Sequence, residues 1–316
     1  MTLRVANAPC SWGALEFSDA LVGGGGGHAP NRPVDGPPTG TLGERILREM
    51  SAAGYAGTEL GDWGLLPTTP EALGALLKAT DLALVGAFVP VPWIAADAVD
   101  RGVRDALRVA RLLAAVADRP FLILADENGA HPVRRGRAGR IRPSEGLAPD
   151  DLRRAVRAVE RVAAEIGDET GLPVVFHHHG GGWFETPDEI SRLLDGTAPE
   201  HLGLCLDTGH YALGGGDPVD ALTRFAGRIP HVHLKDFDPG VVTRADAAGW
   251  DYFDLVREGV FPELGAGAVD FPALANRLRR DGYEGWVVVE QDVLPGMGTP
   301  LESARRNRAT LRSLGW

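Results

Sequence analysis

The chain has 316 residues, of which 44% are hydrophobic, and a formal net charge of −11 at neutral pH. This acidic balance argues against a surface that binds nucleic acid, and no apolar run approaches the roughly 18 residues of a membrane span. Two cysteines, Cys10 and Cys205, are too few and too far apart for a disulfide framework. The first residues also lack the basic and apolar regions of a signal peptide, so we expect a reduced, cytoplasmic protein.

Short apolar runs alternate with longer amphipathic segments along the chain. The runs that predict β-strands are residues 3–8, 56–60, 82–89, 120–125, 173–177, 202–207, 231–234 and 285–290. The segments with helical periodicity are residues 44–53, 101–116, 150–166, 188–194, 218–225, 271–278 and 301–314. Eight strands that alternate with helices favour a single (β/α)₈ TIM barrel domain over residues 1–316. An open doubly wound sheet is the alternative, but no GxGxxG turn follows the first strand.

Two segments interrupt this alternation. Five glycines over 23–27 lead into proline-rich sequence, and no helix starts directly behind them. We therefore expect a flexible insertion over about residues 23–40 rather than a phosphate-binding loop. The segment over about residues 127–143 carries five arginines and several glycines. It predicts either a solvated loop or a lid whose arginines meet an anionic substrate.

The sixth and seventh predicted strands end in side chains that can bind a metal or move a proton. Asp207 closes the sixth, with His210 one helical turn further on, although Asp207 could also simply cap the next helix. His231 and His233 lie on one face of the seventh strand because side chains alternate with period two. Lys235 follows them, and it is one of only two lysines beside thirty arginines. A random surface lysine is therefore a poor explanation for it.

Other strand ends carry the same kinds of group. Glu290 follows three valines, so it needs a cation or a structural salt bridge to be buried. At the end of the fifth strand, His177 and His179 share a face, and Glu185 follows a run of glycines that allows close approach of a ligand.

Glu59 lies at the end of the second predicted strand. Trp12 follows the first predicted strand, where its ring could form a wall against a sugar-like ring or pack in the core. Cys205 shares the face of Asp207 one layer deeper, so we expect it in the barrel core. Asp, Glu and His ligands together suit Mn²⁺, Mg²⁺, Co²⁺ or Zn²⁺ better than a metal selected by thiolates.

With these motifs the sequence resembles the xylose-isomerase-like TIM barrels, the sugar phosphate isomerase/epimerase superfamily, and within it the inosose (2-keto-myo-inositol) dehydratases. The resemblance spans nearly the whole chain. It rests on Gly57-Thr-Glu-Leu-Gly61, Phe176-His-His-His with the following glycines and Glu185-Thr186, Leu206-Asp-Thr-Gly-His210, His231-Val-His-Leu-Lys-Asp236 and Gly265-Ala-Gly-Ala-Val-Asp-Phe271. The segment Cys10-Ser-Trp-Gly-Ala and the glycine insertion depart from the family pattern.

The resemblance implies one divalent metal held by residues from strands 5 to 8. Asp207, His233 and Glu290 match the ligand positions of strands 6 to 8. The usual glutamate of strand 5 falls near His177, which leaves Glu185 as the carboxylate ligand to expect. Mn²⁺ or Co²⁺ is the expected ion, with Mg²⁺ and Zn²⁺ as alternatives, and homo-oligomers are common in the superfamily.

The implied activity is a metal-dependent dehydration of a polyhydroxylated keto compound such as 2-keto-myo-inositol, through an enediolate stabilised by the metal and Lys235. Glu185, His177 or His179 would take the α-proton, and His210 or Glu290 would protonate the departing hydroxyl. The residues expected to contact substrate are Trp12, Glu59, His231 and Asp236.

Three alternatives remain at this point. A ketose 3-epimerase or aldose–ketose isomerase would use the same metal site and first step. A DNA-repair endonuclease would need further metal ligands, but the Asp-x-His pair that should supply them is missing after Asp236. A non-catalytic sugar-binding barrel would bind ligand without metal or turnover.

Overall fold

Eight parallel strands close into a barrel in sequence order, because β1 pairs with both β2 and β8. The computed structural model describes residues 3–13 and 41–316. The strands are β1 (Arg4–Asn7), β2 (Gly57–Glu59), β3 (Ala83–Val91), β4 (Phe121–Asp126), β5 (Val174–His177), β6 (Gly203–Asp207), β7 (His231–Leu234) and β8 (Trp286–Val289). The predicted (β/α)₈ barrel is confirmed, and the open doubly wound sheet is excluded.

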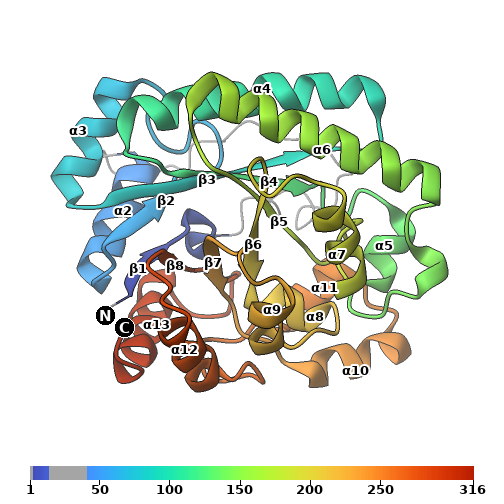
Figure 1. Ribbon diagram of the computed structural model, residues 1–316. Coiled ribbons are helices and arrows are strands. Elements are labelled where there is room, and N and C mark those ends of the chain that lie inside the picture. Colours follow the sequence, from blue (N-terminus) through green and yellow to red (C-terminus); the bar gives the residue numbers. More distant parts are fainter. Residues whose placement is uncertain (1–2, 14–40) are drawn as a thin grey trace.

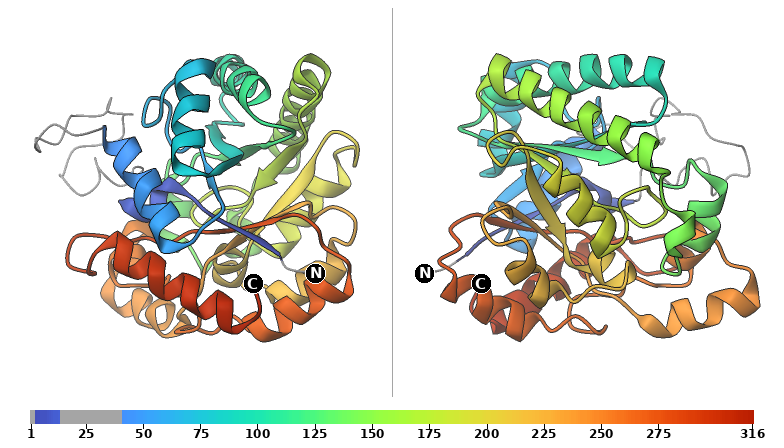
Figure 2. Two further views of the ribbon diagram at one scale, coloured as in Figure 1. Left: turned by 90° about the vertical axis from the view of Figure 1, so that its left-hand side faces the viewer. Right: turned by 45° about the vertical axis from the view of Figure 1, so that its right-hand side comes forward.

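Helices surround this ring, with α4 and α6 on the side opposite α12 and α13 (Figures 1 and 2). The described helices are α2 (Leu42–Ala53), α3 (Pro70–Thr80), α4 (Ala96–Val116), α5 (Pro132–Arg137), α6 (Pro149–Thr170), α7 (Pro187–Asp195), α8 (Thr208–Leu213), α9 (Pro218–Arg224), α10 (Pro239–Ala248), α11 (Tyr252–Arg257), α12 (Phe271–Arg280) and α13 (Pro300–Ser313), with 3₁₀ turns η1 (Pro9–Trp12) and η3 (Pro143–Glu145). Each predicted helix is present with shifted ends, whereas α3, α5, α8, α10 and α11 were not predicted. The expected insertion over residues 23–40 lies outside the described residues.

The helices attach to the barrel through apolar faces of period 3.6. In α6 the buried positions include Val156, Val159, Val162 and Ile166, which recur every three or four residues and face the strands. Inside the barrel, Cys205 lies in a small buried cluster with Ile123 and Val175, as predicted for a core thiol. Among the described residues, no helix is long and apolar enough to cross a membrane.

Strand register brings the polar strand ends together above this core. Asp207 of β6 pairs with His233 of β7, and both lie at the carboxyl ends of their strands, where active sites of such barrels form. The pairing of β2 with β3 shifts between Thr58 and Glu59, an irregularity of the kind that re-aims a side chain. A Cβ at the neighbouring Gly86 would lie 3.0 Å from Ile123 Cδ1 and 3.1 Å from the Phe121 carbonyl oxygen, so glycine allows β3 to pack closely against β4 here.

Candidate metal centre and active site

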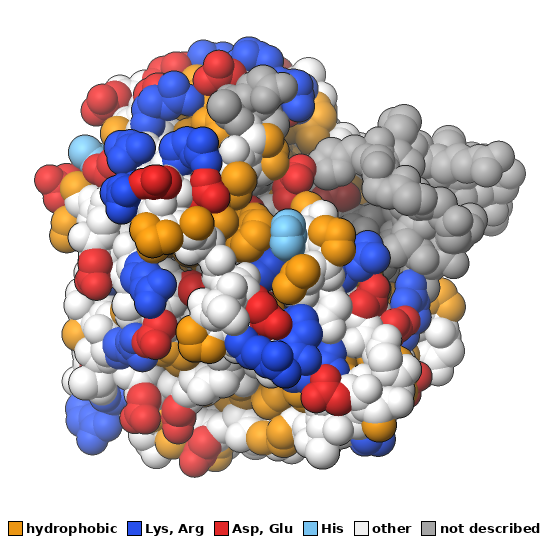
Figure 3. Space-filling model, turned by 90° about the vertical axis from the view of Figure 1, so that its right-hand side faces the viewer, with side chains coloured by type: hydrophobic (Ala, Val, Ile, Leu, Met, Phe, Trp, Pro, Cys, Tyr) orange, Lys and Arg blue, Asp and Glu red, His pale blue; other side chains and the backbone are white. Residues whose placement is uncertain are grey.

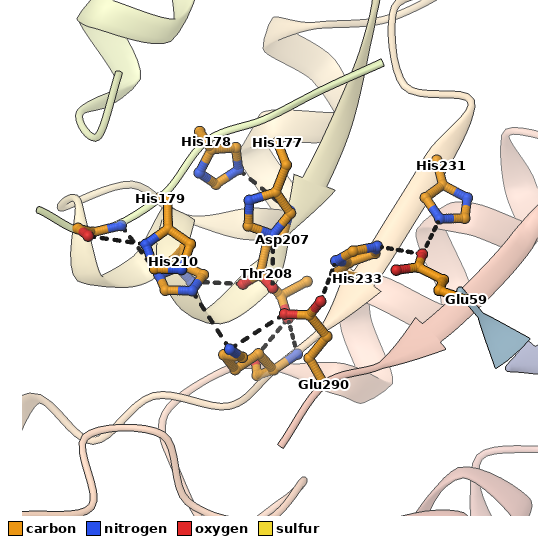
Figure 4. A network of polar contacts seen from close by, with 12 residues as sticks. Glu59, His177, His178, His179, Asp207, Thr208, His210, His231, His233 and Glu290 are labelled. Carbon is orange, nitrogen blue, oxygen red and sulfur yellow. Dashed lines mark hydrogen bonds and ion pairs between the residues drawn. The ribbon is translucent and has the colours of Figure 1, made fainter. Parts of the chain in front are cut away.

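Four side chains from consecutive strands β5 to β8 converge at the barrel mouth. His177, Asp207, His233 and Glu290 each offer one ligand atom, and these four atoms all lie within 4.8 Å of one another. His177 Nε2 lies 3.7 Å from Asp207 Oδ2, and His233 Nδ1 lies 3.0 Å from Glu290 Oε1. In Figure 4 the side chains of these four residues point toward one another. All four are buried, which makes a bare cluster of this kind costly without a cation.

Unpartnered polar atoms in this cluster indicate that a divalent metal fits it. Both ring nitrogens of His177, Oδ2 of Asp207 and Nδ1 of His233 are buried without a hydrogen-bond partner, although such atoms are normally satisfied. The other oxygen of Asp207 accepts a hydrogen bond from the backbone N–H of His210 and caps α8. Asp207 therefore both caps the helix and presents a free oxygen to the cluster.

Glu59 fixes the orientation of His233 from behind. Its Oε1 accepts hydrogen bonds from Nε2 of His231 at 3.0 Å and of His233 at 2.9 Å. Burial alone would raise the pKa of Glu59, but the two imidazoles lower it to about 2. With its Nε2 proton committed to Glu59, His233 has the Nδ1 lone pair free for a metal, which is the usual carboxylate–histidine–metal arrangement.

Lys235 lies between two carboxylates beside the cluster. Its Nζ is 3.3 Å from Glu290 Oε2 and 3.3 Å from Asp292 Oδ2, and it lies 3.5 Å from His210 Nε2. Burial opposes its charge, but Asp292 and Glu290 raise the pKa of Lys235 well above its usual value. Sequence reasoning missed Asp292, although a carboxylate two residues after Glu290 could have been noted.

His179 and Tyr252 form the opposite wall. His179 Nδ1 donates to the carbonyl of Gly180 at 2.9 Å, and its Nε2 lies 3.5 Å from the hydroxyl of Tyr252. Burial and His177 lower the pKa of His179 to about 3, so the ring is neutral near pH 7. His210 stacks against it with ring centroids 3.8 Å apart. Tyr252 comes from the unpredicted helix α11, and no local pattern pointed to it.

One cavity of about 650 Å³, including its open mouth, joins these groups. It is lined by Ala8, Pro9, Cys10, Glu59, Gly61, Asp62, Phe88, His177, His179, Lys235, Tyr252, Glu290 and Asp292. The cavity thus brings His177 and Glu290 of the cluster together with the ammonium of Lys235 and the imidazole of His179. On the part of one molecular face that the structure describes, acidic and basic side chains intermingle around apolar ones (Figure 3).

Comparison with known proteins identifies the family. A model of the xylose isomerase-like TIM barrel matches residues 47–314. The chain belongs to this family. The resemblance inferred from the sequence motifs is therefore confirmed.

Two relatives and one solved structure illustrate the similarity. The chain is 36% identical over 271 residues to the rhizopine catabolism protein MocC of Rhizobium meliloti, covering 85% of this chain and 80% of that protein. It is 29% identical over 302 residues to the inosose dehydratase of Geobacillus kaustophilus, covering 96% and 91%. The structure of 3-keto-D-glucoside 4-epimerase YcjR from E. coli superposes with a TM-score of 0.66 at 19% identity, covering 98% and 99%, which shows the shared fold.

Within this family barrel, the strand 5 member of the cluster is His177, where the sequence prediction had Glu185. Glu185 accepts hydrogen bonds from the backbone N–H groups of Gly139 and Gly181 at 2.6 and 2.7 Å. Burial raises its pKa to about 7, against the opposing effect of Arg134. Glu185 thus joins the loop after α5 to the loop after β5, and it does not line the cavity.

Three predicted substrate contacts also lie away from the cavity lining. Asp236 accepts hydrogen bonds from the backbone N–H groups of Phe237, Gly265, Gly267 and Val269. It therefore holds the loop before α12. The indole of Trp12 donates to Glu49 of α2 at 2.6 Å, and His231 is buried beneath Glu59. Only Glu59 of the predicted contacts lines the cavity.

The arginine-rich segment, for which either a solvated loop or a lid was expected, contains the short helix α5. Arg134 is fully buried, donates to both carboxylate oxygens of Glu189 at 2.8 and 2.9 Å, and donates to the Gly182 carbonyl. Arg140 pairs with Asp246. These arginines are committed to structural partners, and neither is among the residues that line the cavity.

Proposed function

We propose that the chain is a divalent-metal-dependent dehydratase of a polyhydroxylated ketone such as 2-keto-myo-inositol. The observation that carries this proposal is that four potential metal-ligand atoms lie within 4.8 Å of one another, and that two of their residues, His177 and Glu290, line one cavity with Lys235 and His179. The named inosose dehydratases among the relatives support the choice of substrate class.

Each residue at the site has a separate role in the proposed dehydration. His177, Asp207, His233 and Glu290 would hold the metal, which supplies Lewis-acid polarisation of the ketone when bound. His179 is the proposed base, because its Nδ1 proton is donated to Gly180 and its neutral Nε2 can accept the proton α to the ketone. Lys235 would stabilise the oxyanion that develops as that proton leaves. The protonated His179 would then return that proton to the departing hydroxyl, which leaves as water.

His210 has a positioning role in this proposal. It does not line the cavity; it lies behind His179 and accepts a hydrogen bond from the Gly180 backbone N–H at 3.3 Å. Its Nε2 lies 3.5 Å from Lys235. It therefore contacts both the proposed base and the proposed oxyanion partner.

The charge of the cavity favours a neutral substrate. Although the chain has thirty arginines, no arginine is among the described residues that line the cavity. Lys235, the one cation among the described lining residues, already faces two carboxylates. A phosphate or carboxylate group would find no free fork of donors of the kind that binds such anions. A polyol ketone needs none.

The test is turnover of 2-keto-myo-inositol and a panel of ketoses, followed by mass spectrometry. We expect loss of one water from the keto-inositol, abolished by a chelator and restored by Mn²⁺ or Co²⁺. A product of unchanged mass would assign the alternative, a ketose 3-epimerase or aldose–ketose isomerase. Turnover that a chelator leaves undiminished would refute metal dependence.

A further inference from the structure

The donor set of the proposed metal centre is half imidazole and half carboxylate. His177 and His233 supply nitrogens, and Asp207 and Glu290 supply oxygens. With neutral rings the four groups carry a charge of −2, which balances a divalent ion. Magnesium prefers an all-oxygen, largely carboxylate and water environment, whereas imidazole suits Co²⁺, Zn²⁺ and Fe²⁺.

His177 is available as a ligand because nothing else holds its nitrogens. Both are without a hydrogen-bond partner, and the ring is fully enclosed. Its position is set by ring packing against Phe88 at 5.7 Å and His233 at 5.0 Å between centroids. A buried imidazole with two unpartnered nitrogens is explained when one of them binds a cation.

A neighbouring cation partly offsets the negative charge of Glu290, one of the two carboxylates in the cluster. The ammonium of Lys235 lies 3.3 Å from Glu290 Oε2, so the electrostatic field that would hold a hard ion is reduced. Magnesium relies on that field and gives up its water reluctantly, so it loses most. An ion that gains from the two nitrogens loses less.

We propose that His177 makes this centre selective for imidazole-binding ions such as Co²⁺ and Zn²⁺ over Mg²⁺. This inference rests on the proposed function, because it assumes that the centre binds a metal. It goes further by assigning selectivity to one side chain.

The experiment titrates metal-free protein with Mg²⁺, Co²⁺ or Zn²⁺ alone, using calorimetry and competition with a chromophoric chelator, and records the visible spectrum of bound Co²⁺. For His177→Glu we expect Mg²⁺ to bind more tightly and the Co²⁺/Mg²⁺ affinity ratio to fall by about tenfold or more. The Co²⁺ spectrum should also change. His177→Gln, a neutral variant of similar size, should weaken Co²⁺ binding without strengthening Mg²⁺ binding, and circular dichroism reports whether each variant folds.

Two control variants separate this centre from other histidines. Cys205, His231 and His233 form a second group of closely spaced donors, so Cys205→Ser tests whether Zn²⁺ binds there. His201→Gln removes a partly exposed surface histidine. We expect both to keep the wild-type ratio. An unchanged ratio in His177→Glu, or loss of Zn²⁺ binding in Cys205→Ser, would overturn the inference alone, whereas wild-type protein that binds none of these ions would overturn the proposed function.

Discussion

Removing Glu59 should weaken metal binding although Glu59 is not one of the four proposed ligands. Its Oε1 holds the Nε2 atoms of His231 and His233, and this bond directs the His233 Nδ1 lone pair to the centre. Loss of such an outer partner typically costs 10–100-fold in metal affinity, or about 1.4 to 2.7 kcal/mol. We expect Glu59→Leu to lower the metal affinity by an amount near the upper end of this range. Glu59→Gln keeps an acceptor oxygen but loses the charge, so its loss of affinity should lie near the lower end.

The assay is chelator competition with Co²⁺ in the absence of substrate, since Glu59 also lines the cavity. His231→Leu is the matched control, because it removes one partner of Glu59 and keeps the Glu59–His233 bond. Its affinity should stay close to that of the wild type. Normal Co²⁺ binding by Glu59→Leu, or an equal loss of Co²⁺ affinity in His231→Leu, would refute this role of Glu59.

Three further predictions concern the residues around the centre. Lys235→Met should lower kcat by about 10²–10³-fold, because the oxyanion loses its stabilising charge. Metal binding should not weaken, because the ammonium lies 3.3 Å from Glu290 and repels a cation. Steady-state kinetics and metal titration check these two expectations. Arg134→Met leaves the Glu189 carboxylate, which is mostly buried, without its partner and should cost about 3 kcal/mol in urea denaturation. The pKa of Glu185 is raised by burial to about 7, so the native state holds an extra proton between about pH 4.5 and 7. The stability of the wild type relative to Glu185→Gln should therefore fall across that window, by on the order of 3 kcal/mol at most.

For each of these three predictions, a specific result would contradict it. Parallel loss of metal and activity in Lys235→Met would make the lysine a structural part of the centre. For Arg134, the comparison is Arg135→Met, which breaks a more exposed pair with Asp251 and should cost under about 1 kcal/mol; equal losses would contradict the argument from burial. A pH-independent stability difference between wild type and Glu185→Gln would show that the Glu185 carboxyl does not titrate in this window.

Local patterns were enough to predict the barrel and to single out three of the four clustered residues, whose role as metal ligands was implied by the family resemblance. Short apolar runs that break at Asp207, His233 and Glu290 place these groups near the carboxyl ends of strands, and parallel strands bring such ends to one rim. The short helices α8 and α11 were not predicted because each has six residues, which is too few to show an amphipathic pattern. Tyr252 of α11 was missed for the same reason.

The sequence by itself determined the fold and the chemical character of the mouth, because strand periodicity and strand-end polarity are local properties. The tertiary structure decided the assignment of roles. Glu185 and Asp236 bond backbone N–H groups of loops that are distant in sequence. His177 occupies the fourth position, and Glu59 reaches two histidines more than 170 residues away. Such contacts depend on ring closure and strand register, which no local pattern encodes.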